Sequence, residues 1–306
     1  MRCIVVGLAA FIAATAAPAQ TPSPTVTRLT EPQDDYPDVS PDGATILFQS
    51  NRSGTWQLWR LGRDGSGIAR ITNDGFNHRQ PAWSPDGTMV AYSSDQGLTG
   101  GRRAIWLMAA PGSDITVRPR KLSGGAGQDV HPKWLAGGKG LVFNRIAADG
   151  KQADVHIVTL DGNERKIDLG KGLNTYASVD KTGLRIVYRG TTQETGPSGP
   201  VENSDVFTAN ADGSGKRRLT DDPAFDGWPA ISPDGTAIAF ASRRGGDKFR
   251  LYLMPIDGGA ATEIRAPAGY NYTQPAWDRD GTSLIAFRWT ADSAGEVGQL
   301  VRVPLP

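Results

Sequence analysis

The chain has 306 residues, of which 33 are Lys or Arg and 32 are Asp or Glu, so the formal net charge is +1. A balance this even gives no electrostatic argument for nucleic acid or an anionic membrane surface as the partner. Glycine (38 residues) and proline (21 residues) are frequent while aromatic residues make up 8%, a composition typical of many turns between short strands.

The first twenty residues have the order of a secretory signal peptide. Arg2 supplies a positive charge, an apolar run extends from Ile4 to Ala14, and small residues follow at Ala17–Ala19, as export signals require. The alternative is a membrane anchor, for which the apolar run is short. We therefore expect cleavage after Ala19 or Gln20, which also removes the one cysteine, and a periplasmic protein with no membrane span.

A short sequence motif built around a glycine occurs six times after residue 25. Successive copies are 44, 51, 45, 52 and 46 residues apart, a period that indicates one propeller blade per repeat. In each copy two short apolar runs flank a tight turn, often Ser-Pro-Asp-Gly, where glycine tolerates the positive φ that a hairpin turn needs. The anchoring glycines are Gly43, Gly87, Gly138, Gly183, Gly235 and Gly281.

A third and a fourth run follow each turn, as in "DVFTANA" and "RRLT" of the fourth copy, so each copy predicts a four-stranded antiparallel blade. The sixth copy stops after its third run, at Pro306, and the missing run stands at the other end of the chain, as "VTRLT" from Val26 to Thr30. We predict an all-β fold over residues 25–306. It is a six-bladed β-propeller whose last blade is closed by the N-terminal strand, which removes an open edge.

The phrases "QPAWSPDG", "WPAISPDG" and "YPDVSPDG", with the later "LYLM" and "RRLT", resemble the WD40-like (PD40) repeats of the TolB propeller family. The resemblance covers residues 25–306. It implies a periplasmic module that contacts an envelope protein or peptide through its propeller. Members of the TolB type carry an α/β domain before the propeller, and only a few residues stand in that place here, so we expect a stand-alone propeller.

Peptidases with this kind of propeller add an α/β-hydrolase domain, which needs a Gly-x-Ser-x-Gly nucleophile elbow. The sequence contains no such motif. We therefore predict a monomeric, non-catalytic binding module that seats a protein or peptide segment over the mouth of the central channel. Two alternatives stay open: a small metal-dependent glycan lyase or hydrolase, and a sugar-binding propeller.

Two columns of residues are expected to surround the channel mouth, where the loops that enter the first strands converge. Because strand side chains alternate, both columns should point the same way. The column seven residues before each glycine offers aromatic and amide groups for a peptide or sugar: Tyr36, Gln80, His131, Tyr176, Trp228 and Gln274. The column nine residues before it has no aliphatic member: Asp34, His78, Asp129, Asn174, Asp226 and Tyr272. The alternative is that these side chains only bond loop backbones.

The three aspartates of the second column would form an acidic ring that attracts cations. Calcium, bound through oxygen ligands, is therefore the candidate cofactor, and the sequence requires no other. For the enzyme alternative, His78 and His131 with Gln80 and Gln274 could hold a divalent metal, although metal sites normally need three or four well-placed ligands. The polar insert from Gly190 to Ser204 is predicted to be a mobile loop.

Overall fold

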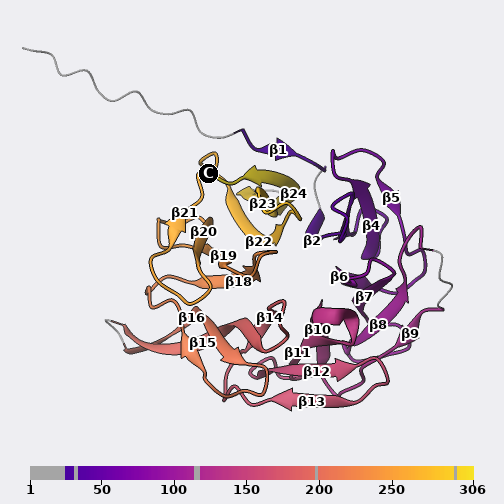
Figure 1. The fold of residues 1–306 in the computed structure, drawn as a ribbon, viewed down its shortest axis with the longest axis horizontal. Helices are drawn as coiled ribbons and strands as arrows, with labels where there is room; N and C mark the ends of the chain where they lie inside the picture. The colour runs from indigo at the N-terminus through magenta and orange to yellow at the C-terminus, as the bar shows by residue number, and fades with distance from the viewer. Residues whose placement is uncertain (1–24, 31–33, 114–117, 197–198, 293–294) are drawn as a thin grey trace, which may run out of the picture.

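The computed structural model describes residues 25–30, 34–113, 118–196, 199–292 and 295–306. These residues form six four-stranded antiparallel sheets arranged as the blades of a ring (Figure 1), which confirms the predicted propeller. The expected signal peptide, residues 1–20, lies outside the described residues. Within the part of the chain that the structure describes, no helix has the length and apolar character of a membrane span.

The blades are numbered in chain order, and their strands are as follows. Blades 1 and 2 contain β2 (Asp34–Val39), β3 (Thr45–Ser50), β4 (Gln57–Gly62), β5 (Ala69–Arg70), β6 (His78–Trp83), β7 (Met89–Ser94), β8 (Ala104–Ala109) and β9 (Arg120–Lys121). Blades 3 and 4 contain β10 (Gln128–Trp134), the 3₁₀ turn η1 (Ala136–Gly138), β11 (Gly140–Ile146), β12 (Ala153–Thr159), β13 (Glu164–Ile167), β14 (Thr175–Val179), β15 (Arg185–Gly196), β16 (Gly199–Asn210) and β17 (Arg217–Arg218). Blades 5 and 6 contain β18 (Asp226–Ile231), β19 (Ala237–Ser242), β20 (Arg250–Pro255), β21 (Thr262–Glu263), β22 (Asn271–Trp277), β23 (Ser283–Asp292), β24 (Gly295–Pro304) and, from the N-terminal end, β1 (Thr27–Arg28).

The outer strand of blade 6 comes from the N-terminal end of the chain. Its sheet has the order β1-β24-β23-β22, with Thr27 paired to Arg302 and Arg28 to Val301. The pairing continues where the Leu29 amide donates to the Leu300 carbonyl at 2.9 Å. Blade 6 is therefore built from segments at both ends of the described chain (Figure 1).

The Ser-Pro-Asp-Gly turns connect the first and second strands of their blades. In blade 1, Gly43 has a φ of 72°, and the Asp42 carboxylate accepts the Ser40 hydroxyl at 2.5 Å and the Ala44 amide at 2.9 Å. The same serine–aspartate bond recurs at Ser84–Asp86 and Ser232–Asp234. The repeated aspartates therefore fold the turns, because glycine supplies the left-handed backbone and aspartate caps its amides.

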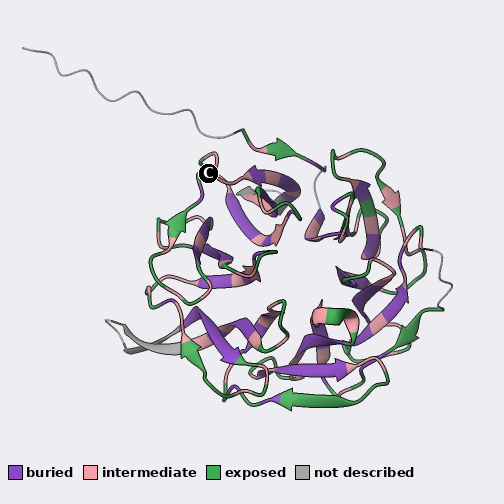
Figure 2. Ribbon diagram, in the orientation of Figure 1, coloured by how far each residue is buried: buried purple, intermediate pink, exposed green. Residues whose placement is uncertain are grey.

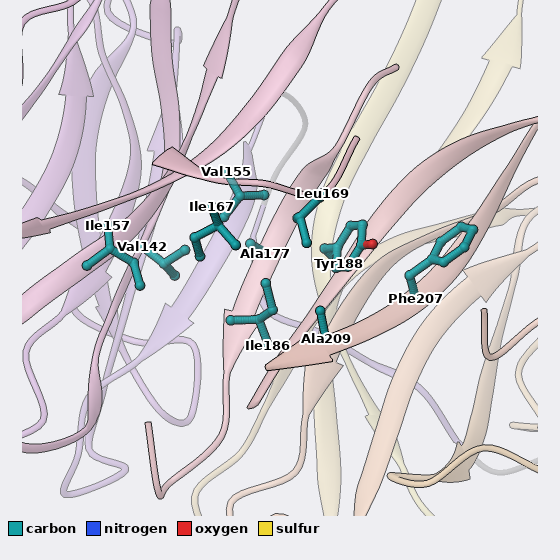
Figure 3. Packing of buried hydrophobic residues seen from close by; sticks show 10 residues of the cluster. All are labelled: Val142, Val155, Ile157, Ile167, Leu169, Ala177, Ile186, Tyr188, Phe207 and Ala209. Atoms are coloured by element: carbon teal, nitrogen blue, oxygen red, sulfur yellow. The ribbon is translucent and has the colours of Figure 1, made fainter. Parts of the chain in front are cut away.

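Hydrophobic packing occurs between neighbouring blades rather than around one centre. The inner strands are largely buried, and the short outer strands β5, β9 and β21 are mostly exposed (Figure 2). Between blades 3 and 4, Val142 and Val155 lie in the same cluster as Ile186, Tyr188 and Phe207 (Figure 3). Each blade thus stabilises the next by burying apolar surface between them.

The segment from Gly190 to Ser204, predicted to be a loop, lies within the hairpin of β15 and β16. Gly190 pairs with Asp205, and the pairing runs on to Gly196 opposite Gly199. The loop prediction was wrong for the described part of this segment, because the Thr-Thr-Gln-Glu-Thr run contains threonines, which favour strands, despite the polar, glycine-rich composition around it.

Candidate functional site

The first column of candidate residues has an unusual backbone. Its six members are the only non-glycine residues with positive φ among the described ones, and their φ values lie between 53° and 56°. Residues other than glycine rarely adopt this left-handed backbone conformation, which costs on the order of 1–3 kcal/mol per residue. We call these six the channel ring: Tyr36, Gln80, His131, Tyr176, Trp228 and Gln274.

The left-handed backbone coincides with a break in strand pairing. In blade 1 the register between β2 and β3 shifts between Asp35 and Asp38, and equivalent shifts surround the ring residue in blades 2 to 6. A bulge of this kind re-aims a side chain. In five of the six strands the ring residue is followed by proline, which cannot donate a ladder hydrogen bond and so suits such a break.

The channel ring forms one end of a cavity of about 190 Å³ at the centre of the propeller. The lining also includes the next residues of the first strands, among them Pro37, Pro132 and Pro229, and residues of two turns, Pro233 and Arg279. The cavity therefore lies on the face that carries the turns between first and second strands, here called the turn face. The opposite face, where the loops enter the first strands, is called the loop face.

Aromatic side chains of the ring meet across the channel. The Tyr36 hydroxyl lies 3.3 Å from the His131 Nε2 atom and 3.3 Å from the Tyr176 hydroxyl. The His131 and Tyr176 rings have centroids 4.0 Å apart, and those of Tyr176 and Trp228 are 5.7 Å apart. Since blades 1 and 4 stand on opposite sides of a six-bladed ring, these contacts close the channel. We call Tyr36, His131, Tyr176 and Trp228 the aromatic plug.

The amide members of the ring hold the backbones of other ring residues. Gln274 Oε1 accepts the Tyr36 amide at 2.9 Å, and Gln80 Oε1 accepts the His131 amide at 3.0 Å. These two glutamines were predicted to hold a ligand. Their side-chain oxygens accept partly buried backbone amides, which would be costly to leave unpaired.

The aromatic plug is uncharged near neutral pH. Burial, reinforced by the charge of Arg189, lowers the pKa of His131 to about 3. Burial also raises the pKa of Tyr36 well above its usual value, and the neighbouring Tyr176 acts in the same direction. The floor of the cavity is thus a neutral surface of rings.

Charged groups occur on the cavity wall above this floor, and the sequence reasoning missed them. The Lys133 ammonium lies 2.7 Å from Asp38 Oδ1, while Asp38 Oδ2 accepts the Trp83 amide at 2.8 Å. Arg279 donates to the Val39 carbonyl at 2.8 Å. Asp38 and Lys133 both stand five residues before a glycine anchor, and this shared position is the signal that could have found them.

The second column is not at a channel mouth, contrary to expectation. All six members are buried, with exposed fractions of 0 to 3%, and none of them lines the cavity. Residues two apart point to the same face only in a regular strand. The bulge lies between the two columns and interrupts this alternation. The members placed away from the cavity are Asp34, His78, Asp129, Asn174, Asp226 and Tyr272.

The aspartates of the second column are paired with arginines of their own blades. Asp34 pairs with Arg52, and Asp226 Oδ2 lies 2.6 Å from Arg244 Nη2. Burial raises the pKa of Asp226, while bonding to Ser242 and the Arg244 charge oppose that rise. The expected acidic ring for calcium is therefore replaced by separate ion pairs inside the blades.

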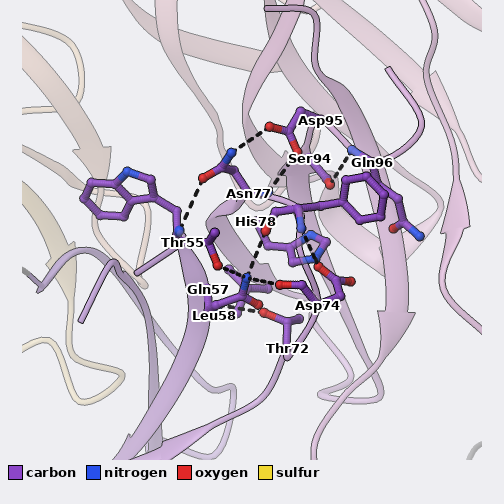
Figure 4. Close-up of polar contacts among 12 residues, drawn as sticks. Thr55, Gln57, Leu58, Thr72, Asp74, Asn77, His78, Ser94, Asp95 and Gln96 are labelled. Carbon is purple, nitrogen blue, oxygen red and sulfur yellow. Dashed lines mark hydrogen bonds and ion pairs between the residues drawn. The ribbon is translucent and has the colours of Figure 1, made fainter. Parts of the chain in front are cut away.

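The two histidines of the metal alternative are not brought to one site. His78 is buried, and its Nε2 atom lies 2.9 Å from Asp74 Oδ1 (Figure 4). Its ring also meets the Tyr92 ring edge-on. His131 instead belongs to the aromatic plug. Across the described ranges, no group of three or more His, Cys, Asp or Glu residues is placed to hold a metal ion.

Asp35, which lies between the two columns in β2, predicts a pH dependence of stability. Burial raises its pKa to about 7, against the effects of a bond to Gln49 and the charge of Arg79. The folded protein holds this proton more tightly than the unfolded chain, so the contribution of Asp35 to stability is fully present below about pH 4 and is lost as pH rises through about 7.

We expect Asp35→Asn to raise the free energy of unfolding at pH 8 by on the order of 2 kcal/mol and to flatten its decline between pH 4 and pH 8. Urea unfolding across this range measures both effects, with the exposed Asp149→Asn as the control. An unchanged pH profile in Asp35→Asn would show that another group causes the dependence.

Sequence comparison finds local matches to curated proteins. The chain is 27% identical over 147 residues to a TolB homolog of Chlorobium luteolum, covering 48% of this chain and 31% of that protein. It is 24% identical over 300 residues to dipeptidyl-peptidase 5 of Porphyromonas gingivalis, covering 80% of this chain and 43% of the peptidase. The chain thus spans less than half the length of the curated relatives it matches. No protein-family model matches it.

Solved structures share the architecture. A TolB-type protein of Agrobacterium tumefaciens superposes with a TM-score of 0.66 at 20% identity, covering 92% of this chain and 97% of that one. An oligogalacturonate lyase in complex with manganese gives a TM-score of 0.57 at 15% identity, with 94% of each chain covered. At these identities the likeness establishes the fold, and one fold serves many activities.

Proposed function

The chain is a TolB-like six-bladed β-propeller, and we propose that it works as a non-catalytic binding module in the periplasm. The ligand is a segment of an envelope protein or peptide, seated in the cavity on the turn face. One observation carries this proposal: all six blades hold a strained residue at the same place, and together these residues shape one cavity. Strain repeated in this way persists only where the surrounding structure enforces it.

The chemistry of the cavity favours binding. Its floor is aromatic and its wall is rich in proline, and such concave apolar sites with few polar groups are typical of ligand pockets. Tyrosine and tryptophan also dominate the residues that carry binding energy at interfaces. Asp38 and Lys133 would orient a segment whose apolar side chain fills the cavity.

The histidine in the floor argues against acid–base catalysis there. A general acid or base works best with a pKa near the ambient pH, and burial holds the pKa of His131 at about 3. It therefore stays neutral and supports the proposal as a packing and hydrogen-bonding group.

Location in the periplasm rests on the order of residues 1–20 and on the similarity to TolB homologues. An envelope protein or peptide is then the accessible class of partner.

The proposal is tested by filling the cavity. Ser178 lines it and is partly exposed, so Ser178→Trp should block the cavity without removing core packing. We expect affinity capture from a native envelope extract to recover a partner with the wild-type protein and at least about tenfold less of it with the variant.

The matched control is Ser214→Trp, which places the same side chain on an exposed turn of blade 4. Equal recovery by wild type, Ser178→Trp and Ser214→Trp would contradict binding in the cavity.

A further inference from the structure

Beyond the turn-face cavity, two arginines lie on the loop face of the aromatic plug. Arg79 is the residue before Gln80 of the ring, and Arg103 directly precedes β8. His78 pairs with Ser94, and Ser94 with Ala104. The start of β6, the end of β7 and the start of β8 therefore share one end of blade 2, which brings both arginines to the loop face.

Arg79 is held over an aromatic ring. Its guanidinium carbon lies 4.5 Å from the centroid of Trp56, and its Nε atom is buried without a hydrogen-bond partner. The Trp56 amide donates to Asn77 Oδ1 at 3.3 Å, and the Asn77 side chain donates to Asp95 Oδ2 at 2.7 Å (Figure 4). This network anchors the backbone of Trp56 and occupies the carboxylate of Asp95.

Arg103 is anchored through its backbone next to the channel. It bridges to Gln128, and its carbonyl accepts the Asp129 amide at 3.1 Å, so it lies beside the start of the first strand of blade 3. Its charge acts on the plug residue His131 and on Arg79. Arg103 therefore stands at the same end of blade 2 as Arg79, beside the start of blade 3.

The positive charge of this pair is only partly offset by the protein. Burial lowers the pKa of Arg79, and the charge of Arg103 lowers it further. Neither arginine forms an ion pair with a carboxylate among the described residues. The acids in reach are Asp95, which bonds Asn77, and Asp35, whose pKa is raised to about 7.

Half-buried charges of like sign are costly when no counter-charge accompanies them. Arginine presents a planar fork of donors that matches carboxylate and phosphate oxygens. Two such forks at one end of blade 2 therefore have the chemistry of an anion site.

We propose that Arg79 and Arg103 form a second ligand site, which binds a phosphate or carboxylate group at the loop face of the channel. The aromatic plug separates this site from the turn-face cavity, so the two sites take different ligands. The proposal does not depend on the protein or peptide partner proposed above.

Calorimetric titration with inorganic phosphate, and separately with malonate, tests the site at pH 8 and constant ionic strength. We expect saturable binding of at least one of them. Arg79→Gln and Arg103→Gln should each weaken it by at least about tenfold. Tighter binding of inorganic phosphate would indicate a natural ligand with a phosphate group, and tighter binding of malonate one with a carboxylate group.

The matched control is Arg243→Gln. Arg243 follows β19 at the loop-face end of blade 5, and its guanidinium carbon lies 4.2 Å from the centroid of the Phe249 ring. It therefore stacks on an aromatic ring as Arg79 does, but it stands outside the proposed site. Equal weakening by Arg243→Gln would overturn the proposal in favour of a general positive field, and so would the absence of saturable binding of both probes.

A second variant, which keeps both arginines, is expected to strengthen anion binding rather than weaken it. Asp35 faces Arg79, Asp34 and Gln49, and at pH 8 its carboxylate competes with a bound anion for Arg79. Asp35→Asn should therefore strengthen binding of the same probe by about threefold or more. Weaker binding in a folded Asp35→Asn protein would contradict the site.

Discussion

Asp129→Ala should lower the free energy of unfolding by about 3–5 kcal/mol. The Asp129 carboxylate is fully buried and accepts Arg145 Nε at 2.7 Å, Arg145 Nη2 at 2.8 Å and the Ser123 hydroxyl at 2.6 Å. Removing it deprives the Ser123 hydroxyl and the half-buried Arg145 guanidinium of this partner, although Arg145 keeps its ion pair with Glu164. Breaking a buried pair by removing one partner is strongly destabilising.

Urea unfolding measures this effect, and Asp149→Ala, on an exposed turn, is the control, with an expected change within about 0.5 kcal/mol. The result distinguishes two roles for the second column. If Asp129→Ala kept wild-type stability and lost ligand binding, the carboxylate would act as a ligand group at a mouth rather than as part of the blade.

Leu29→Ala should cost about 2–5 kcal/mol of unfolding free energy. Leu29 directly follows β1 and is 6% exposed. It belongs to a cluster that joins blade 1, through Val39 and Phe48, to blade 6, through Ile285 and Leu300. Truncation opens a void at the one junction where the first and last blades meet, so the closure of the ring is weakened as well as the local packing.

The control is Leu184→Ala, because Leu184 is 70% exposed and its loss should change stability by less than about 0.5 kcal/mol. Urea unfolding, followed by limited proteolysis of the N-terminal segment, measures both variants. Equal stability of Leu29→Ala and Leu184→Ala would show that the ring holds without its N-terminal strand.

The architecture could be predicted because its signals are local and repeated. Each blade carries its own Asp-Gly-type turn, as at Gly43 and Gly235, and an apolar alternation on either side of it. The period between the turns then indicates how many blades there are. The last blade was predictable for the same reason, since "VTRLT" resembles the outer run that ends at Thr220.

The site was only half predictable, because it depends on a departure from regular strand geometry. A count of two residues from Asp34 to Tyr36 implies the same face only in an unbroken strand, and the bulge changes this in all six blades. The proline after the ring residue, as at Pro81 and Pro275, was the visible trace of the bulge.

Chemistry alone was equally ambiguous for the charged residues. Asp226 is buried and paired with Arg244. In the sequence such an aspartate cannot be distinguished from one that faces a ligand. In the same way, the sequence does not distinguish Arg79 and Arg103 from arginines that form ion pairs. Only their positions in the fold show that neither forms an ion pair with a carboxylate among the described residues.

The central claim, that a partner segment occupies the turn-face cavity, is tested most directly by site-specific photo-crosslinking. A photoreactive phenylalanine analogue at Lys133, a partly exposed residue of the cavity wall, should crosslink the captured partner. The same group at Lys121, on the outer strand of blade 2, should not. Crosslinking at Lys121 with none at Lys133 would place the partner on the rim and contradict the claim.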